Sequence, residues 1–128
     1  MNRFSLLSAT NLIVELDKIS KDELLEILKK EENIAFIMSK GLSVVQYILD
    51  TRELEELSSN FLFYGFFIQK NEPTDIIHYI LKQHYWKKYW NKTIYSIQQF
   101  NTNYLQDYQS NIVKTERISI RNFLKIIS

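Results

Sequence analysis

The residues of this chain that could do chemistry are concentrated in the stretch HYWKKYWNK at positions 84–92. Lysine ammonium groups can neutralise phosphates, and aromatic rings between them can stack on bases. On one continuous helix, the side chains that share an outward arc here are His78, Lys82, Tyr85, Tyr89 and Lys92. A further basic row, spaced by four residues, consists of Arg117, Arg121 and Lys125. Together these side chains are a candidate nucleic-acid face.

A second candidate is the acidic segment DTRELEE at positions 50–56. Helical spacing turns its leucine toward the core and its carboxylates, those of Asp50, Glu53, Glu55 and Glu56, toward solvent. Complementary charge accelerates protein association, and a small acidic protein can neutralise an enzyme by covering its cationic active site. The segment therefore predicts a docking surface for a protein with a basic surface, such as a toxin or nuclease.

No catalytic, metal or cofactor site is indicated by the residue pattern. His78 and His84 are six positions apart, which on a helix separates them by about 120°, unlike the i, i+4 pair of a helical metal site. The chain has no cysteine and only two glycines, so thiolate zinc sites and phosphate-cradling loops are disfavoured. Nucleophile motifs such as G-x-S-x-G are absent from the sequence. We therefore expect a protein that is not an enzyme.

Charge is distributed unevenly along the 128 residues, although the net charge is only +1. Residues 1–60 hold seven Lys or Arg and eleven Asp or Glu, a balance of −4; residues 61–128 hold nine and four, a balance of +5. This split favours a basic partner for the first half or nucleic acid for the second. It also allows a homo-oligomer in which opposite halves pair.

Composition favours a cytoplasmic protein encoded by an AT-rich gene, as in many mobile elements. Isoleucine, asparagine, lysine, tyrosine and phenylalanine are abundant, while cysteine is absent, which fits a reducing compartment. The longest apolar run, residues 61–68, is far below the roughly 20 residues that span a bilayer. Polar residues such as Asn11 and Glu15 interrupt the first apolar stretch, so we expect neither a signal peptide nor a membrane segment.

The elements that must position these residues are helices, because two glycines and one proline are too few for a turn-rich β fold. The central one is expected at about 72–100, with Asn71 as N-cap and Pro73 in its first turn. One face of that helix would hold Trp86 and Trp90 among isoleucines, which predicts that both rings are structural.

Capping patterns predict further helix starts at Ser20, Ser43 and Asp50, each followed three positions later by Glu or Gln. From Asp50 an apolar stripe runs over about five turns to Ile68. Gly41 should end a helix with a positive φ, and Gly65, inside the stripe, should allow close approach of a bulky neighbour.

The fold expected from these elements is all-α, a single domain over 1–128: a compact bundle of five to seven helices around the helix 72–100. The alternative is a short α-solenoid, because VVQYILDT at 44–51 and IIHYILKQ at 76–83 align at an offset of 32 residues. The expected function is a non-enzymatic protein-binding module of the inhibitor or immunity type. The alternatives are a nucleic-acid-binding regulator and a homo-oligomeric structural protein.

Overall fold

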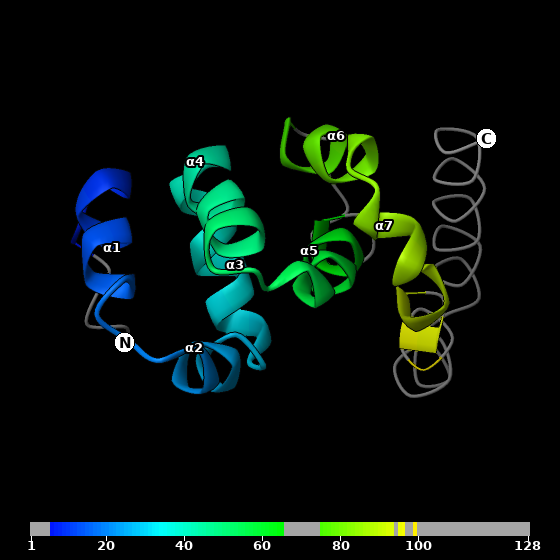
Figure 1. The fold of residues 1–128 in the computed structure, drawn as a ribbon, viewed down its shortest axis with the longest axis horizontal. Coiled ribbons are helices and arrows are strands. Elements are labelled where there is room, and N and C mark those ends of the chain that lie inside the picture. Colours follow the sequence, from blue (N-terminus) through cyan, green and yellow to red (C-terminus); the bar gives the residue numbers. More distant parts are fainter. Residues whose placement is uncertain (1–5, 66–74, 94, 97–98, 100–128) are drawn as a thin grey trace, which may run out of the picture.

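The computed structural model describes residues 6–65, 75–93, 95–96 and 99, and every regular element within them is helical. The all-α class is therefore confirmed (Figure 1). The α-helices are α1 Ala9–Leu16, α2 Lys21–Ile27, α3 Glu31–Lys40, α4 Leu42–Gln46, α5 Ser58–Phe63, α6 Asp75–Lys82 and α7 Tyr85–Lys88. A π-helical segment, η1 Tyr47–Thr51, continues α4, and a 3₁₀ turn, η2 Glu55–Leu57, leads into α5.

The helix at the centre of the described fold is α4, not the expected helix 72–100. It packs against α1, α3 and α6, while α5 contacts α3, α6 and α7. Figure 1 shows the helices following one another from α1 at one end to α7 toward the other. Each contributes apolar side chains to one core cluster, including Leu12, Leu16, Leu24, Ile34, Val44, Ile48, Phe61, Ile77, Ile80 and Trp86.

The expected continuous helix over 72–100 is wrong, because α6 ends at Lys82 and α7 begins at Tyr85. The Gln83 N–H instead bonds to the Ile80 carbonyl at 3.1 Å, which tightens the last turn. On an unbroken helix the buried Ile77 and Ile80 would point roughly 160° away from the buried Trp86 and Thr93. The break redirects the chain so that both groups reach the core. The expected start at Asn71 and Pro73 lies outside the described residues.

Of the three predicted capping boxes, the one at Ser20 is confirmed in its serine half, where the hydroxyl accepts from the Glu23 N–H at 3.2 Å. The box at Ser43 is wrong, since α4 begins at Leu42 with Gly41 as its N-cap, two residues before the predicted cap. The box at Asp50 is also wrong, because Asp50 lies inside η1 and Glu53 has a positive φ of 56°. Because Tyr47, Ile48 and Leu49 are buried, the helical segment that begins with α4 continues through Asp50 and no new helix starts there.

Each of the two glycines occupies a position where a side chain would be unfavourable, for a different reason in each case. Gly41 has φ 105° and ψ 177°, an extended positive-φ conformation that other residues avoid, and a Cβ added there would meet nothing within 4 Å. At Gly65 a Cβ would lie 2.6 Å from Ile77 Cδ1 and 3.3 Å from Met38 Cε. The predicted close approach at Gly65 is thus confirmed, with an isoleucine of α6 as the neighbour.

The two similar octapeptides occupy corresponding helices. Residues 44–51 form most of α4 and all of η1, and residues 76–82 form most of α6. Matching positions are buried in both, with Val44 and Val45 corresponding to Ile76 and Ile77 and Ile48 to Ile80. The two helices also contact each other. The sequence similarity therefore reflects a shared inward face.

Gly65→Ala should destabilise the protein by about 1–2 kcal/mol, although alanine is the better helix former by ~1 kcal/mol, because the new methyl overlaps Ile77. Adding Ile77→Val, which removes Cδ1, should make the combined cost smaller than the sum of the single costs. Urea unfolding followed by far-UV circular dichroism measures this. Gly41→Ala is the matched control. Its destabilisation would come from the positive φ and not from a clash with Ile77, so the costs of Gly41→Ala and Ile77→Val should simply add. A Gly65→Ala protein more stable than wild type would contradict the packing argument.

Trp86→Ala should cost about 3–5 kcal/mol of the free energy of unfolding, since the side chain is 8% exposed. Trp90→Ala should cost less, because Trp90 is only partly buried against the core. The rings are perpendicular with centroids 6.3 Å apart, so each truncation also removes an edge contact. Thermal unfolding of both variants, with the phenylalanine variants as controls, tests the ranking. A larger loss at Trp90 would show that the wrong ring was assigned to the core.

Candidate functional site

The four carboxylates predicted to dock a partner lie at one corner of the fold, and we refer to Asp50, Glu53, Glu55 and Glu56 as the acidic edge. Asp50 belongs to η1, Glu53 lies in the connection, and Glu55 and Glu56 belong to η2. Asp50 and Glu53 are exposed. Glu55 and Glu56 are half-buried rather than fully exposed as expected, because η2 packs against both η1 and α7.

Arg52, which was not singled out from the sequence, fixes this corner to α1. Its guanidinium donates to the Leu16 carbonyl at 2.7 Å and to the Ile19 carbonyl at 2.8 Å. Carbonyls at a helix C-terminus lack intrahelical donors and carry partial negative charge, so a cation is favoured there. The sequence shows a single arginine among four acidic residues, a pattern that by itself predicts only a surface ion pair and not this contact with α1.

Tyr47 makes a second connection between η1 and α1. Its hydroxyl donates to Asp17 Oδ1 at 2.8 Å, and Asp17 directly follows α1. Burial raises the pKa of the Tyr47 phenol, with the neighbouring Asp17 carboxylate adding to the rise and the Arg52 guanidinium opposing it. The phenol therefore stays protonated and remains a hydrogen-bond donor across the neutral pH range.

Glu53 has the single positive φ among the described non-glycine residues, at 56°. This left-handed residue reverses the chain, so that the Leu54 N–H bonds to the Ile48 carbonyl at 3.2 Å and satisfies the end of η1. On one side of Glu53, the Arg52 side chain is hydrogen-bonded to the end of α1. On the other side, the Leu54 side chain is buried. The exposed Glu53 carboxylate is thus carried by a backbone with little freedom.

The structure brings together residues that the sequence assigned to two separate faces. Lys88 of α7 forms an ion pair with Glu55 at 3.2 Å. The Tyr85 hydroxyl is buried close to the Asp50 carboxyl but makes no well-formed hydrogen bond to any described residue. Lys88 of the same chain therefore neutralises part of the charge of the acidic edge. The carboxylates of Glu53 and Glu56 pair with no described cation.

Partial burial shifts the pKa values of two groups at this corner, Asp50 and Tyr85. Burial raises the pKa of the Asp50 carboxyl above its usual value of 3.8, and the Tyr85 hydroxyl lowers it again in part. Burial, followed by the negative charges of Asp50 and Glu55, raises the pKa of the Tyr85 phenol well above its usual range. Hydrogen bonding to Glu55 raises the pKa of Lys88.

The predicted nucleic-acid face is divided by the break between α6 and α7. His78 and Lys82 are exposed on α6, whereas the Tyr85 hydroxyl is buried beside Asp50. Lys92 lies elsewhere, in a cleft against α3 and α5. Tyr89 is half-buried, with the Lys88 ammonium 5.5 Å from its ring centre. Arg117, Arg121 and Lys125 lie outside the described residues. Binding of nucleic acid stays a prediction, but the single outward arc behind it is wrong.

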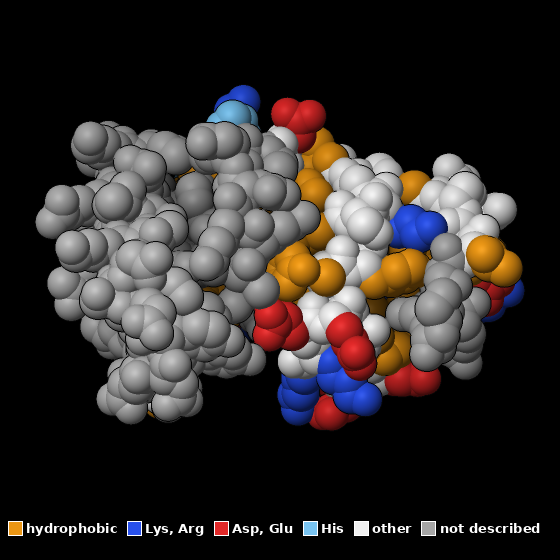
Figure 2. Space-filling model, turned by 180° about the vertical axis from the view of Figure 1, so that it is seen from behind, with side chains coloured by type: hydrophobic (Ala, Val, Ile, Leu, Met, Phe, Trp, Pro, Cys, Tyr) orange, Lys and Arg blue, Asp and Glu red, His pale blue; other side chains and the backbone are white. Residues whose placement is uncertain are grey.

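Side chains of both charge signs share the face seen from behind (Figure 2). In the view from behind, acidic and basic side chains alternate along the lower edge, with apolar side chains gathered above them (Figure 2). Within the described residues, no group of three or more His, Asp or Glu side chains could hold a metal ion. Nor is any helix among them long and apolar enough to cross a membrane.

Comparison of the chain with protein-family models, curated proteins and solved structures finds no match.

Tyr85→Phe should leave the free energy of unfolding at pH 7 equal to that of wild type or up to about 1 kcal/mol higher, because it removes a buried hydroxyl that lacks a well-formed partner. The folded protein holds the phenol proton more tightly than the unfolded chain, whose tyrosine pKa is near 10.0. Wild type should therefore lose stability as the pH rises above about 10, and the variant should lose less. Urea unfolding from pH 7 to 11 measures this difference. Tyr95→Phe, at an exposed tyrosine, is the control and should follow wild type.

Proposed function

We propose that this protein is a non-enzymatic protein-binding module, of the inhibitor or immunity type, that docks through its acidic edge onto a partner with a basic surface. The observation that carries the proposal is the anchored connection that presents the exposed Glu53 carboxylate, with Glu56 three positions further along in η2. Arg52 anchors the connection to α1 with two hydrogen bonds of 2.7 and 2.8 Å, and Glu53 projects from it at a positive φ.

Rigid presentation matters because ordering a loop on binding costs free energy that a fixed loop has already lost on folding. A non-glycine residue with a positive φ is sparsely populated and persists where its surroundings fix it. Here the surroundings are the buried Leu54 on one side and the anchored Arg52 on the other. A charged tip of this kind supports fast and specific association with an oppositely charged surface.

For the scaffold, we favour the stack of helix pairs over a bundle around one long helix. The support is the corresponding burial in α4–η1 and α6, and the contacts of α1 with α4 and of α7 with α5 and η2. Such stacking would leave the connections between helices, including residues 52–54, along an edge where a partner can reach them.

The test uses the double reversal Glu53→Lys with Glu56→Lys. These positions are better probes than Glu55, whose reversal would also set a lysine against Lys88. The matched control is Asp22→Lys with Glu32→Lys, an equal charge change at exposed positions of α2 and α3. A partner is first identified as a protein captured from the host by wild type and by the control, but lost with the acidic-edge reversal.

Surface plasmon resonance on that partner should then show an association rate lowered by about tenfold or more at low salt, with a smaller change in dissociation. The difference should shrink as salt rises, because the Debye length falls to about 3 Å at 1 M. Melting temperatures of all three proteins provide the check on folding. Equal association rates for the acidic-edge reversal and the control would contradict the proposal. Binding of random DNA or RNA at low salt, unaffected by the acidic-edge reversal, would favour the nucleic-acid alternative.

A further inference from the structure

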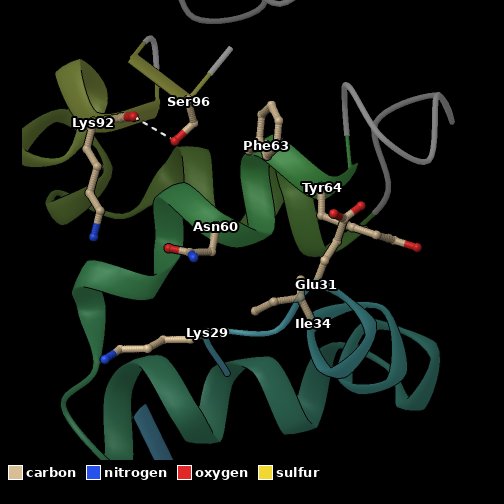
Figure 3. A pocket seen from close by; sticks show the side chains of 8 residues that line it. All are labelled: Lys29, Glu31, Ile34, Asn60, Phe63, Tyr64, Lys92 and Ser96. Atoms are coloured by element: carbon tan, nitrogen blue, oxygen red, sulfur yellow. Dashed lines mark hydrogen bonds between the residues drawn. The ribbon is translucent and has the colours of Figure 1, made fainter. Parts of the chain in front are cut away.

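A cleft of about 240 Å³ opens on another part of the molecule, where α5 and the helical turns after α7 meet the corner between α2 and α3 (Figure 3). Its walls come from Lys29, Glu31, Ile34, Asn60, Phe63, Tyr64, Lys92 and Ser96. None of these residues belongs to the acidic edge. Lys92 is the one member that the sequence had assigned to a functional face, and it was assigned to the nucleic-acid face.

One side of the cleft is rich in hydrogen-bond donors that an anion could use. Figure 3 shows the Lys29 and Lys92 side chains extending to the same side, where the Asn60 amide also lies. The single Ser59 hydroxyl proton is shared between the Glu56 carbonyl at 3.2 Å and the Asn60 side-chain oxygen at 3.3 Å, and the Asn60 amide N–H groups donate to no described residue. Among the described residues Lys92 makes no ion pair, and Lys29 pairs with Glu26 in a contact where both side chains are two-thirds exposed. Such exposed pairs contribute little and exchange readily.

The other side of the cleft is apolar and carries one opposing charge. Ile34 is 3% exposed and Phe63 is half-buried, so both present carbon surface to the cleft. Glu31 extends beside Tyr64 in Figure 3, away from the two ammonium groups, and therefore does not neutralise the donor side. The cleft thus has a cationic end and an apolar wall, with its one carboxylate at the far end.

The walls are held in place without a ligand. The Asn33 side chain donates to the Ile27 carbonyl at 2.7 Å, which ties the end of α2 to the start of α3. The Ser96 hydroxyl donates to the Lys92 carbonyl at 3.1 Å, which fixes the turn that carries Lys92. A concave, largely preformed site with few convergent polar groups is the usual form of a small-molecule site.

We propose that this cleft binds a small amphiphilic anion, in which Lys29, Lys92 and Asn60 hold a carboxylate or phosphate head and Phe63 and Ile34 contact an apolar body of about one ring. The volume sets the size: pockets for drug-sized ligands measure roughly 300–1,000 Å³, so a cleft of about 240 Å³ suits one ring and its head group. The inference is independent of the docking role of the acidic edge.

The test is a titration of the ¹⁵N-labelled full chain with phenyl phosphate, phenylacetate and the uncharged benzyl alcohol, followed by amide chemical shifts. Saturable shifts at Ile34, Asn60 and Phe63 are expected with the anions and not with the alcohol. Lys92→Gln should weaken anion binding about three- to tenfold, and Lys29→Gln should act in the same direction. Lys82→Gln, at an exposed lysine of α6 outside the cleft, is the matched control and should bind like wild type.

Binding of one anion and not the other would assign the head group as phosphate or carboxylate, and binding of both would show that the shared charge suffices. Asn60→Asp gives a second readout, because it replaces the amide donor by a carboxylate of the same shape and should abolish anion binding. Circular dichroism establishes that this half-buried variant is folded. The proposal is overturned if the cleft amides do not shift. It is equally overturned if Lys82→Gln weakens binding as much as Lys92→Gln does.

Discussion

The position of the acidic edge depends on the two hydrogen bonds that Arg52 donates to the last carbonyl of α1 and to the Ile19 carbonyl just beyond it. Without them, the Leu16 and Ile19 carbonyls would lose their charged donor, and α1 would be held to α4 and η1 by apolar contacts and the Tyr47–Asp17 hydrogen bond. The same guanidinium fixes the chain where it leaves η1, so it also sets the position of Glu53 and the start of η2. One side chain thus couples the first helix to the corner that carries the acidic edge. A lysine could supply the charge but not the two divergent donors.

What the sequence could predict is limited to features with a local cause. Ser20 caps α2 because its hydroxyl needs only the N–H three residues ahead, and Gly41 has a positive φ because the chain must turn there at once. Each of these follows from neighbours within about one helical turn, so no knowledge of the rest of the fold was needed.

The missed features have causes distant in sequence. Neither Gly nor Pro marks the break after Lys82; it allows α7, which carries the buried Trp86, to pack against α5 and η2 in a direction different from that of α6. The Asp50 start signal is overridden because Tyr47, Ile48 and Leu49 are buried against other helices. The acidic edge was found as a segment, but its anchor on Leu16 and its ion pair with Lys88 join residues more than thirty positions apart. Periodicity cannot encode such pairings, and the same holds for the cleft that joins Lys29 to Lys92.

The placement of both tryptophans on and beside α7 has a consequence for spectroscopy. Trp86 and Trp90 lie four positions apart with rings at 85°, and the sequence has no other tryptophan. Intrinsic fluorescence excited at long wavelength therefore reports on this short region and not on α1 to α4, which contain no indole. If α7 separates from α5 before the remaining helices melt, the emission maximum shifts red while the far-UV signal is still native-like. Coincidence of the two signals would instead mean that the edge formed by α7 and the core around α4 unfold as one cooperative unit.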